Sequence, residues 1–201
     1  MVNHFFEREK LMNIFNKVVI AAVFVANVSF GWCVDDAAVD EFRATRGRMD
    51  TSAMREFIGR NETIRGDVLN EICEITYGTA LNFACSEGDR NLVDLLLERG
   101  ADLNLMAVYS PLMVAAFHDH QCVVEWLAHS GSAINTENQE GWTALSASCQ
   151  TLHKKEWSAV TGILLMYGAD LYHVDHHGRT PLSYLTPAMQ ADYTAQYPRQ
   201  N

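Results

Sequence analysis

The sequence has few basic residues. Its 201 residues include 15 lysine and arginine residues against 25 aspartate and glutamate residues, which gives a formal net charge of −10 at pH 7. A protein that binds nucleic acid needs a basic face for the phosphates, so this balance argues against a nucleic-acid partner. It permits a basic protein partner, although acidity on this scale also serves solubility alone.

The short motifs of common catalytic centres are absent as well. The sequence contains no G-x-S-x-G nucleophile motif, no H-E-x-x-H metal motif and no phosphate-binding loop. Three histidines flank Asp175, at His173, His176 and His177. A closed zinc site needs four converging ligands, and no cysteine or second histidine pair is placed to complete one. We therefore predict a non-enzymatic chain with no metal and no cofactor; an unrecognised metal site at residues 173–177 is the enzymatic alternative.

The sequence has one long apolar run, near the N-terminus. Lys10 and Lys17 precede the apolar residues 18–25, and Ser29 and Gly31 then supply small residues at positions −3 and −1 of a cleavage site. This order of a basic segment, an apolar segment and small residues is typical of a secretory signal peptide.

From this pattern we predict a signal peptide at residues 1–31, followed by a connector at residues 32–36. Met12 would give a leader of more usual length and is an alternative start. The rival interpretation is an uncleaved inner-membrane anchor at residues 18–34, but these 17 residues contain polar positions and are shorter than the ~20 that a span needs. We expect a periplasmic or secreted protein with no stable membrane association after cleavage.

The rest of the chain is internally repetitive. A threonine or serine followed by x-Leu opens four units with spacings of 31, 33 and 37 residues, at Thr79, Ser110, Thr143 and Thr180. A tail similar to Gly-Ala-Asp closes three of them 21, 21 and 25 residues later, at Gly100, Gly131 and Gly168. The turn before Ser110 is thus two residues short, and four extra residues lie around residues 150–157. An insertion there maps to a loop between two helices and leaves a stack of repeats intact.

This combination resembles the ankyrin-repeat family, because the T-P-L core and the L-L-L-x-x-G-A-D tail recur together about every 33 residues. The resemblance implies an all-α solenoid in which no repeat buries its apolar face alone, so that stacking builds a continuous core. We predict an array of about four to five helix-turn-helix repeats at residues 37–193, followed by a polar tail at residues 194–201. Its repeats are expected at 37–64 (degenerate), 79–104, 110–135, 143–171 and 180–193 (truncated).

Some positions within the predicted array have a structural interpretation. Asn61 falls where the next repeat has Gly100, and asparagine tolerates a left-handed helix cap better than other non-glycine residues. Residues 65–77 are expected to form an extended loop or a short extra helix. Asp119 stands where the family has a glycine, between two histidines that we interpret as turn residues.

The five cysteines form no C-x-x-C pair. Cys85 and Cys149 occupy the same position two repeats apart, where the resemblance implies small core residues. A disulfide needs α-carbons within ~7 Å, so these two are too far apart to bridge. For an exported protein one pair among Cys33, Cys73 and Cys122 stays open, and buried free thiols are the interpretation that we favour.

The resemblance also implies where a partner binds, namely at the turn tips and on the exposed positions of the first helices. Mapped onto this sequence, the candidate partner-binding residues are Tyr77, Asn82, Val108, Tyr109, Met113, Phe117, Gln139, Glu140, Trp142, Ser146, His176, His177 and Arg179, with Glu87 and Ser183 as further positions. Tyr109, Phe117 and Trp142 are the expected anchors, because aromatic residues often dominate binding energy. His176 and His177 are expected at the exposed tip of a turn.

The histidine of the family's T-P-L-H motif is replaced in each repeat of this chain. The residues in its place are Asn82, Met113, Ser146 and Ser183. We expect this replacement to remove a hydrogen bond that rigidifies the turns.

The sequence therefore predicts an exported, monomeric module, of bacterial type, that binds a protein partner through its concave face. An inhibitor or immunity protein for a secreted toxin or lipase is a special case that rests on analogy alone. The alternative, from another class, is a scaffold protein held at the inner membrane by residues 18–34.

Overall fold

A computed structural model describes residues 51–61, 64, 66–71, 78–151 and 158–198 of the chain. These residues form helices, and no strand occurs among them. The elements in chain order are α3 (Thr51–Arg60), α4 (Gly66–Leu69), α5 (Ala80–Glu87), α6 (Arg90–Glu98), α7 (Pro111–Phe117), α8 (Gln121–His129), α9 (Ala144–Thr151), α10 (Ala159–Met166), the 3-10 helix η2 (Pro181–Tyr184) and α11 (Pro187–Gln196). The predicted signal peptide, the connector and residues 37–50 of the degenerate repeat lie outside this described part.

The chain divides into two compact units, Met1–Phe57 and Ile58–Asn201. The structure describes only residues 51–57 of the first unit, which belong to α3. The described part of this helix, Thr51–Arg60, buries Met54, Phe57 and Ile58.

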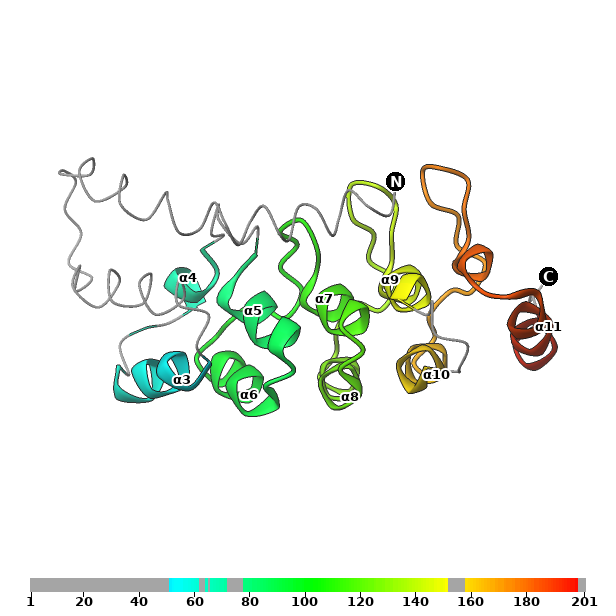
Figure 1. The fold of residues 1–201 in the computed structure, drawn as a ribbon. Coiled ribbons are helices and arrows are strands. Elements are labelled where there is room, and N and C mark those ends of the chain that lie inside the picture. The colour runs from blue at the N-terminus through cyan, green and yellow to red at the C-terminus, as the bar shows by residue number, and fades with distance from the viewer. Residues whose placement is uncertain (1–50, 62–63, 65, 72–77, 152–157, 199–201) are drawn as a thin grey trace, which may run out of the picture. The chain divides into compact units, whose positions relative to one another are not determined.

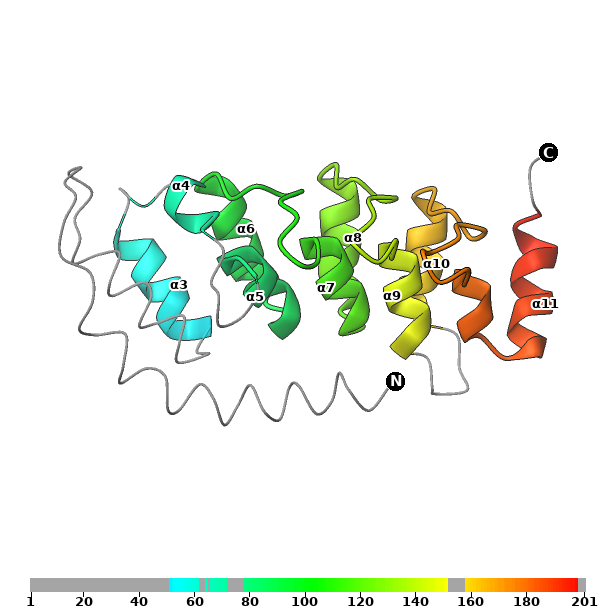
Figure 2. The same ribbon diagram turned by 90° about the horizontal axis from the view of Figure 1, so that it is seen from above.

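The second unit contains three helix pairs, α5–α6, α7–α8 and α9–α10 (Figure 1). The first helices contact one another in the order α5, α7, α9 and η2, and the second helices in the order α6, α8 and α10 (Figure 2). Two rows of helices thus lie side by side, one made of first helices and the other of second helices. This arrangement confirms the predicted all-α stack of helix-turn-helix repeats.

Each first helix begins where the sequence predicted. Before α5, α7 and α9, the side-chain oxygen of the threonine or serine that opens the repeat accepts a hydrogen bond from the backbone N–H three residues later, which satisfies one free donor of the first turn; Thr180, before η2, makes no such bond. These capping oxygens belong to Thr79, Ser110 and Thr143, at 3.2, 3.2 and 3.3 Å. Gly100 follows α6 with a φ of 88°, a left-handed conformation that glycine adopts without strain.

The core between the rows is built from small residues on the first helices and larger aliphatic residues on the second. Ala84, Cys85, Ala116 and Cys149 are almost completely buried. Cys85 and Cys149 are free thiols, which confirms their prediction as small core residues, whereas Cys122 is free and exposed. Burial raises the pKa of the Cys149 thiol to about 12 and also raises that of Cys85.

The non-glycine residue that has a left-handed backbone conformation is not the one that the sequence predicted. Among the described residues, Asp119 is the one non-glycine residue with positive φ, at 60°. The prediction for Asn61 was therefore wrong; its carbonyl oxygen instead accepts hydrogen bonds from Ile64 N–H at 3.3 Å and Arg99 Nη1 at 3.1 Å. Asp119 does occupy the family's glycine position, and Ser158 Oγ donates to its carboxylate at 2.6 Å.

The segment before the first complete repeat contains a single helical turn, α4, as one of the two expected alternatives. Gly66 lies so close to the next repeat that a Cβ on it would meet the carbonyl oxygen of Gly100 at 2.1 Å. Asn70 Oδ1 accepts a hydrogen bond from Asp102 N–H at 2.8 Å. The described part of this segment is thus fixed to the loop that follows α6.

The last repeat ends differently from the prediction. Residues 181–184 form η2, and Pro187 begins α11. Proline suits the first helical position because its missing N–H would have no intrahelical partner there. Helix α11 continues to Gln196, beyond the predicted end of the array at residue 193.

No helix in the described part of the chain is both long and apolar enough to cross a membrane. The predicted leader or anchor at residues 18–34 lies outside that part.

Candidate protein-binding surface

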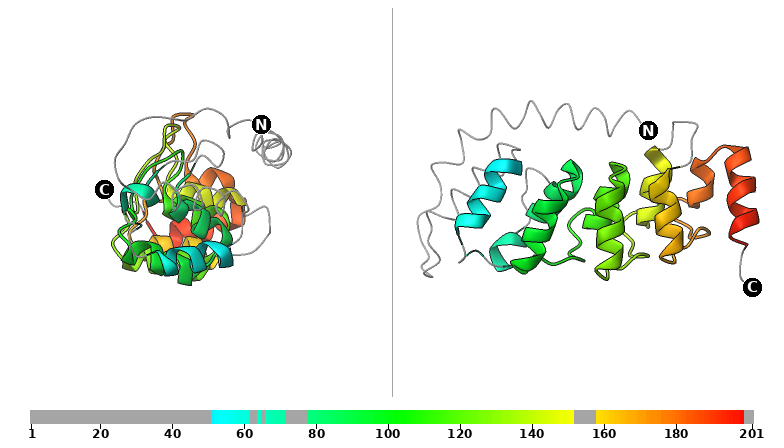
Figure 3. Two further views of the ribbon diagram at one scale, coloured as in Figure 1. Left: turned by 90° about the vertical axis from the view of Figure 1, so that its left-hand side faces the viewer. Right: turned by 90° about the horizontal axis from the view of Figure 1, so that it is seen from below.

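Three loops connect the second helix of one repeat to the first helix of the next. We call them the finger loops and define them as residues 105–109, 136–142 and 173–179, between Asn104, Asn135 or Tyr172 on one side and the capping residue of the next helix on the other. All three lie on the same side of the helix rows (Figures 1 and 3). They contain most of the predicted partner-binding residues.

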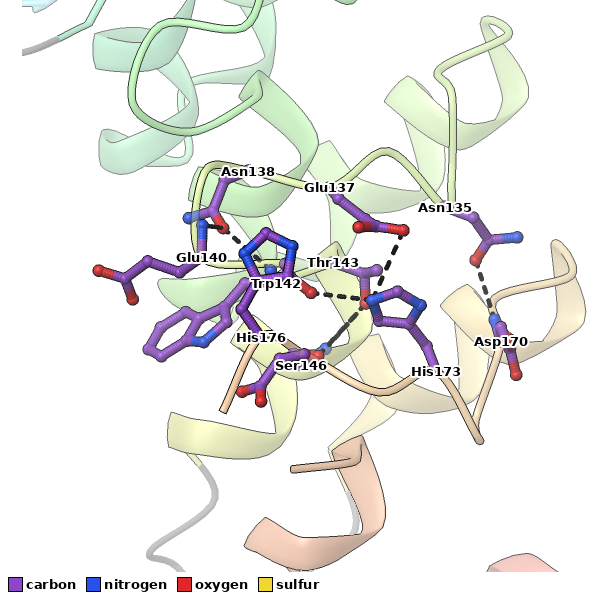
Figure 4. Close-up of polar contacts among 12 residues, drawn as sticks. Asn135, Glu137, Asn138, Glu140, Trp142, Thr143, Ser146, Asp170, His173 and His176 are labelled. Carbon is purple, nitrogen blue, oxygen red and sulfur yellow. Dashed lines mark hydrogen bonds and ion pairs between the residues drawn. The ribbon is translucent and has the colours of Figure 1, made fainter. Parts of the chain in front are cut away.

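Finger loop 136–142 is closed by the side chain of Asn138. Its Oδ1 accepts the backbone N–H groups of Glu140 and Trp142 at 3.0 and 2.9 Å (Figure 4). The Asn138 N–H also donates to the Trp142 carbonyl at 3.0 Å, and the Gly141 N–H donates to the Asn138 carbonyl at 2.9 Å. These bonds build a defined turn that holds Gln139 and Glu140 exposed at its tip.

Finger loop 173–179 repeats this construction with Asp175 in place of Asn138. Asp175 Oδ1 accepts the N–H groups of His177 and Arg179 at 2.8 and 2.9 Å, and Oδ2 accepts from Arg179 Nε at 2.8 Å. Burial alone would raise the pKa of this carboxyl, but the two N–H donors and the guanidinium hold the pKa below its ordinary value. His176 and His177 are exposed at the tip, as predicted.

The two long finger loops contact each other. The His176 N–H donates to the Glu140 carbonyl, and His176 Nδ1 contacts the Gln139 carbonyl, both at 3.1 Å. His173 Nε2 lies 2.8 Å from the Gly141 carbonyl (Figure 4). A carbonyl oxygen only accepts, so these two ring nitrogens must carry the protons in these contacts. His173 and His176 therefore join one loop to the next.

An aromatic and cationic cluster lies below the tips of these two loops. The Arg179 guanidinium carbon is 5.6 Å from the ring centroid of Trp142 and 5.6 Å from that of Tyr184. A cation at this distance over an aromatic face is attracted to the ring quadrupole. Arg179 thus contacts both rings and Asp175. These contacts help to position the side chain of Trp142, which is half-buried.

Finger loop 105–109 presents Val108, whose exposed fraction is 42%. Its end is fixed by Asn82, since Asn82 Nδ2 donates to the Tyr109 carbonyl at 2.8 Å while Thr79 Oγ1 donates to Asn82 Oδ1 at 2.8 Å. The predicted loss of a turn hydrogen bond is therefore wrong at Asn82, because the asparagine itself supplies a bond between the helix and the loop.

The predicted residues thus divide into groups. Gln139, Glu140, Trp142, His176, His177 and Arg179 come together on the two long finger loops, and Val108 and Tyr109 lie on the short one. Phe117 is the last residue of α7 and is half-buried. The seven residues of this helix, about 10 Å in length, separate it from that loop. Glu87 and Ser183 are exposed. Tyr77 lies outside the described residues.

Three of the predicted residues are buried and do not belong to an exposed surface. They are Asn82, Met113 and Ser146, whose exposed fractions are 6%, 1% and 3%. Each is the third residue after the position that opens its repeat. The role of Asn138 in closing its loop was not predicted, although the Asn-x-x-Gly spacing matches Asp175-x-x-Gly178 37 residues later.

The second helices carry a separate shallow depression of about 300 Å³. It is lined by Arg90, Cys122, Glu125, Trp126, His129 and Tyr167. The Arg90 guanidinium carbon lies 4.6 Å from the Trp126 ring centroid and fills part of the space above the indole. No predicted partner-binding residue lines this depression. Among the described residues, no group of three or more histidine, cysteine, aspartate or glutamate side chains is arranged to hold a metal ion.

Comparison with known families agrees with the geometry. The family model described as "Ankyrin repeats (3 copies)" matches residues 112–190, and the model "Ankyrin repeat" matches residues 76–105. The chain belongs to the ankyrin-repeat family. Ankyrin repeats are protein–protein interaction modules, so membership of this family supports the predicted interaction module.

Curated relatives share only a part of their length with this chain. It is 29% identical over 107 residues to the tyrosine-protein kinase HTK16 of Hydra vulgaris, which covers 51% of this chain and 14% of the kinase. It is 33% identical over 103 residues to the probable E3 ubiquitin-protein ligase XBOS32 of rice, covering 49% of this chain and 20% of the ligase. It is 37% identical over 77 residues to the human ankyrin repeat and KH domain-containing protein 1, covering 38% of this chain and 3% of that protein. The chain thus spans a fifth or less of each relative, and the similarity concerns the repeats.

Proposed function

We propose that this ankyrin-repeat chain is a non-enzymatic module that binds a protein partner through its finger loops. The observation that supports this most is the mutual fixing of the two long loops. Glu140 and His176 are joined through the backbone, and Asn138 and Asp175 close the turns from within. Because the backbone of these loops is already fixed, the loops lose little further conformational entropy when a partner binds, which favours affinity.

Affinity capture with the tagged chain from an extract of the producing cells, with mass spectrometry, tests the proposal. A Tyr109→Ala/Trp142→Ala variant is run beside the wild type, and a Glu98→Gln/Asp192→Asn variant serves as the control because both residues are exposed and lie on α6 and α11. We expect one protein that the wild type and the control capture and the aromatic variant loses. Thermal unfolding of the wild type and of both variants shows that each protein is folded. Capture that is unchanged in the aromatic variant would contradict the assignment of the surface.

We further propose that the chain acts after export, in the periplasm or outside the cell. The support is the order of basic, apolar and small residues at positions 10–31. N-terminal sequencing of the protein purified from its producing cells tests this and is expected to begin at Trp32. Full-length protein that stays with the membrane after a carbonate wash would instead favour the anchored scaffold.

As a narrower proposal, the partner is a secreted toxin or lipase that this chain inhibits. A rigid, non-catalytic surface on an exported protein suits that role, and this support is analogy. An adjacent effector gene, followed by loss of its product's activity on mixing with the purified chain, is the expected outcome. Full activity of that product in a stoichiometric mixture would rule out inhibition.

A further inference from the structure

The tips of the finger loops are not level, because loop 105–109 is shorter than the two loops that follow it. We call the difference in height between loops 105–109 and 136–142 the step. Loops 136–142 and 173–179 have seven residues each and close with Asn-x-x-Gly or Asp-x-x-Gly, whereas loop 105–109 has five residues and lacks this turn. Figure 1 shows loop 105–109 projecting less far than the two loops that follow it. Within the described part of the chain, one flank of loop 136–142 therefore has no neighbouring tip on the side of loop 105–109.

The step leaves a backbone donor without its usual partner. In loop 173–179 the His176 N–H donates to the Glu140 carbonyl of the preceding loop at 3.1 Å. Gln139 occupies the matching position of loop 136–142, and its N–H makes no hydrogen bond within the described part of the chain. The missing acceptor is the one that a full-length preceding loop would supply. An extended segment of another chain can supply it, since added strands bind through such unpaired backbone groups.

The charge of the described repeats favours a basic occupant. Residues 78–151 and 158–198 contain twelve aspartate and glutamate residues, three arginines and no lysine. Each arginine is already engaged: Arg90 with Asp94 and the Trp126 ring, Arg99 with the carbonyls of residues 58 and 61, and Arg179 with Asp175. The three arginines of these described residues are thus held in contacts within the chain.

Loop 136–142, which forms the wall of the step, carries an exposed carboxylate at its tip, Glu140. Glu137 faces the following loop instead, because its carboxylate lies 3.7 Å from His173 Nε2 (Figure 4). The apolar side chain of Val108 is exposed on the short loop below. The step therefore offers one backbone donor, one negative charge and an apolar contact.

From this combination we propose that the step binds an extended, basic segment of the protein partner. A backbone carbonyl of that segment accepts the Gln139 N–H, a lysine or arginine side chain contacts Glu140, and an apolar side chain packs on Val108. This inference rests on the proposed function, because it names the chemistry of the partner that the finger loops bind.

Fluorescence anisotropy with two labelled eight-residue peptides on the full chain tests the proposal. One peptide alternates lysine with valine, and the other alternates glutamate with valine. The lysine peptide is expected to bind, more weakly as salt rises, and the glutamate peptide is not. No binding of the lysine peptide, or equal binding of both peptides, would overturn the proposal.

Three variants separate the contributions. In the first, loop 105–109 is lengthened to Leu-Met-Asn-Ser-Ser-Gly-Tyr, which restores the missing turn without adding charge and should abolish peptide binding. In the second, Glu140→Gln, the dissociation constant should rise about fivefold, as expected for one surface charge. In the Glu98→Gln/Asp192→Asn control it should stay within about twofold. Binding that the lengthened loop leaves unchanged would show that the step is not the site.

The same variants distinguish failure of this inference from failure of the proposed function. A partner that is lost by Tyr109→Ala/Trp142→Ala but retained by the lengthened loop would leave the function standing and overturn the step. Light scattering of the wild type and the lengthened variant covers a third outcome. Self-association that disappears when the loop is lengthened would mean that a second copy of this chain occupies the step, and would overturn the basic segment.

Discussion

The side chain of Asn135 bridges to the next repeat through two hydrogen bonds. Its Oδ1 accepts the backbone N–H of Asp170, and its Nδ2 donates to the Gly168 carbonyl, both at 2.9 Å. Asn104, at the matching position of the preceding repeat, accepts the Ala133 N–H at 2.8 Å. A ladder of asparagines thus ties successive repeats together at the base of the finger loops.

The ladder predicts that Asn135→Ala destabilises the array. The substitution removes an acceptor and a donor in contact with Asp170 and Gly168, and two solvent-accessible hydrogen bonds are together worth about 1–2 kcal/mol. Urea unfolding measures the difference. Asn91→Ala is the control, because Asn91 is exposed on α6, and its effect should stay within about 0.5 kcal/mol. Equal midpoints for wild type and Asn135→Ala would show that the ladder does not contribute to stability.

The repeats themselves could be predicted from the sequence because their signals are local. Thr79, Ser110 and Thr143 cap first helices through their own side chains, and Gly100 needs a left-handed backbone. Such interactions depend on residues three or four apart, so they are visible in the sequence. The buried position of Cys85 followed from the same register.

The candidate surface was less predictable because exposure depends on neighbouring repeats. Asn82 and Ser146 stand at a position that the resemblance treats as exposed, yet both are buried, and Asn82 bonds to the loop before the next repeat. The unpaired N–H of Gln139 could not be inferred from its own loop, since it results from two residues missing from loop 105–109. Contacts between repeats therefore decide what a partner can reach.

The left-handed backbone of Asp119 predicts an order of stability among its variants. Asp119→Ala keeps a Cβ in a strained conformation and loses the hydrogen bond from Ser158, so it should cost about 1–2 kcal/mol. Asp119→Gly loses the same bond but relieves the strain, and it should be about 1 kcal/mol more stable than Asp119→Ala. Urea unfolding of both variants checks the order. A glycine variant less stable than the alanine variant would contradict the strain argument.

The close approach of Gly66 to Gly100 predicts opposite effects for two glycine-to-alanine substitutions. In Gly66→Ala the new Cβ would meet a backbone oxygen at 2.1 Å, so α4 must move and the variant should lose about 2–3 kcal/mol. Gly162 lies inside α10 with nothing within 4 Å of such a Cβ. Gly162→Ala should gain about 0.5–1 kcal/mol, because alanine favours a helix interior. Thermal unfolding of both variants measures the contrast, and a change of the same sign in both would contradict it.

Burial predicts which thiols react in the folded protein. In a Cys33→Ser/Cys73→Ser background, a thiol reagent at neutral pH should modify Cys122 rapidly and leave Cys85 and Cys149 unmodified, because these two are buried and keep their protons. Two further thiols should react once urea unfolds the chain. Mass spectrometry of the modified peptides assigns the sites, and rapid labelling of Cys149 in the native state would contradict the described core.

The comparison of Asp175 with Asn138 predicts how the last finger loop responds to acid. In Asp175→Asn the amide oxygen can still accept the N–H groups of His177 and Arg179, as Asn138 does in its own loop, but the charged contact with Arg179 Nε is lost. The variant should fold and lose about 1–2 kcal/mol at neutral pH.

The pH dependence of that difference follows from the lowered pKa of Asp175 in the folded state. The stability that the carboxylate contributes is fully present above its unfolded pKa of about 3.9, and it is lost as the pH falls through the lower folded value. Urea unfolding of wild type and Asp175→Asn should therefore show a constant gap from about pH 5 to pH 7, which closes below about pH 4. A gap that widens on acidification would mean that the folded pKa lies above the unfolded one and that the guanidinium does not stabilise the carboxylate.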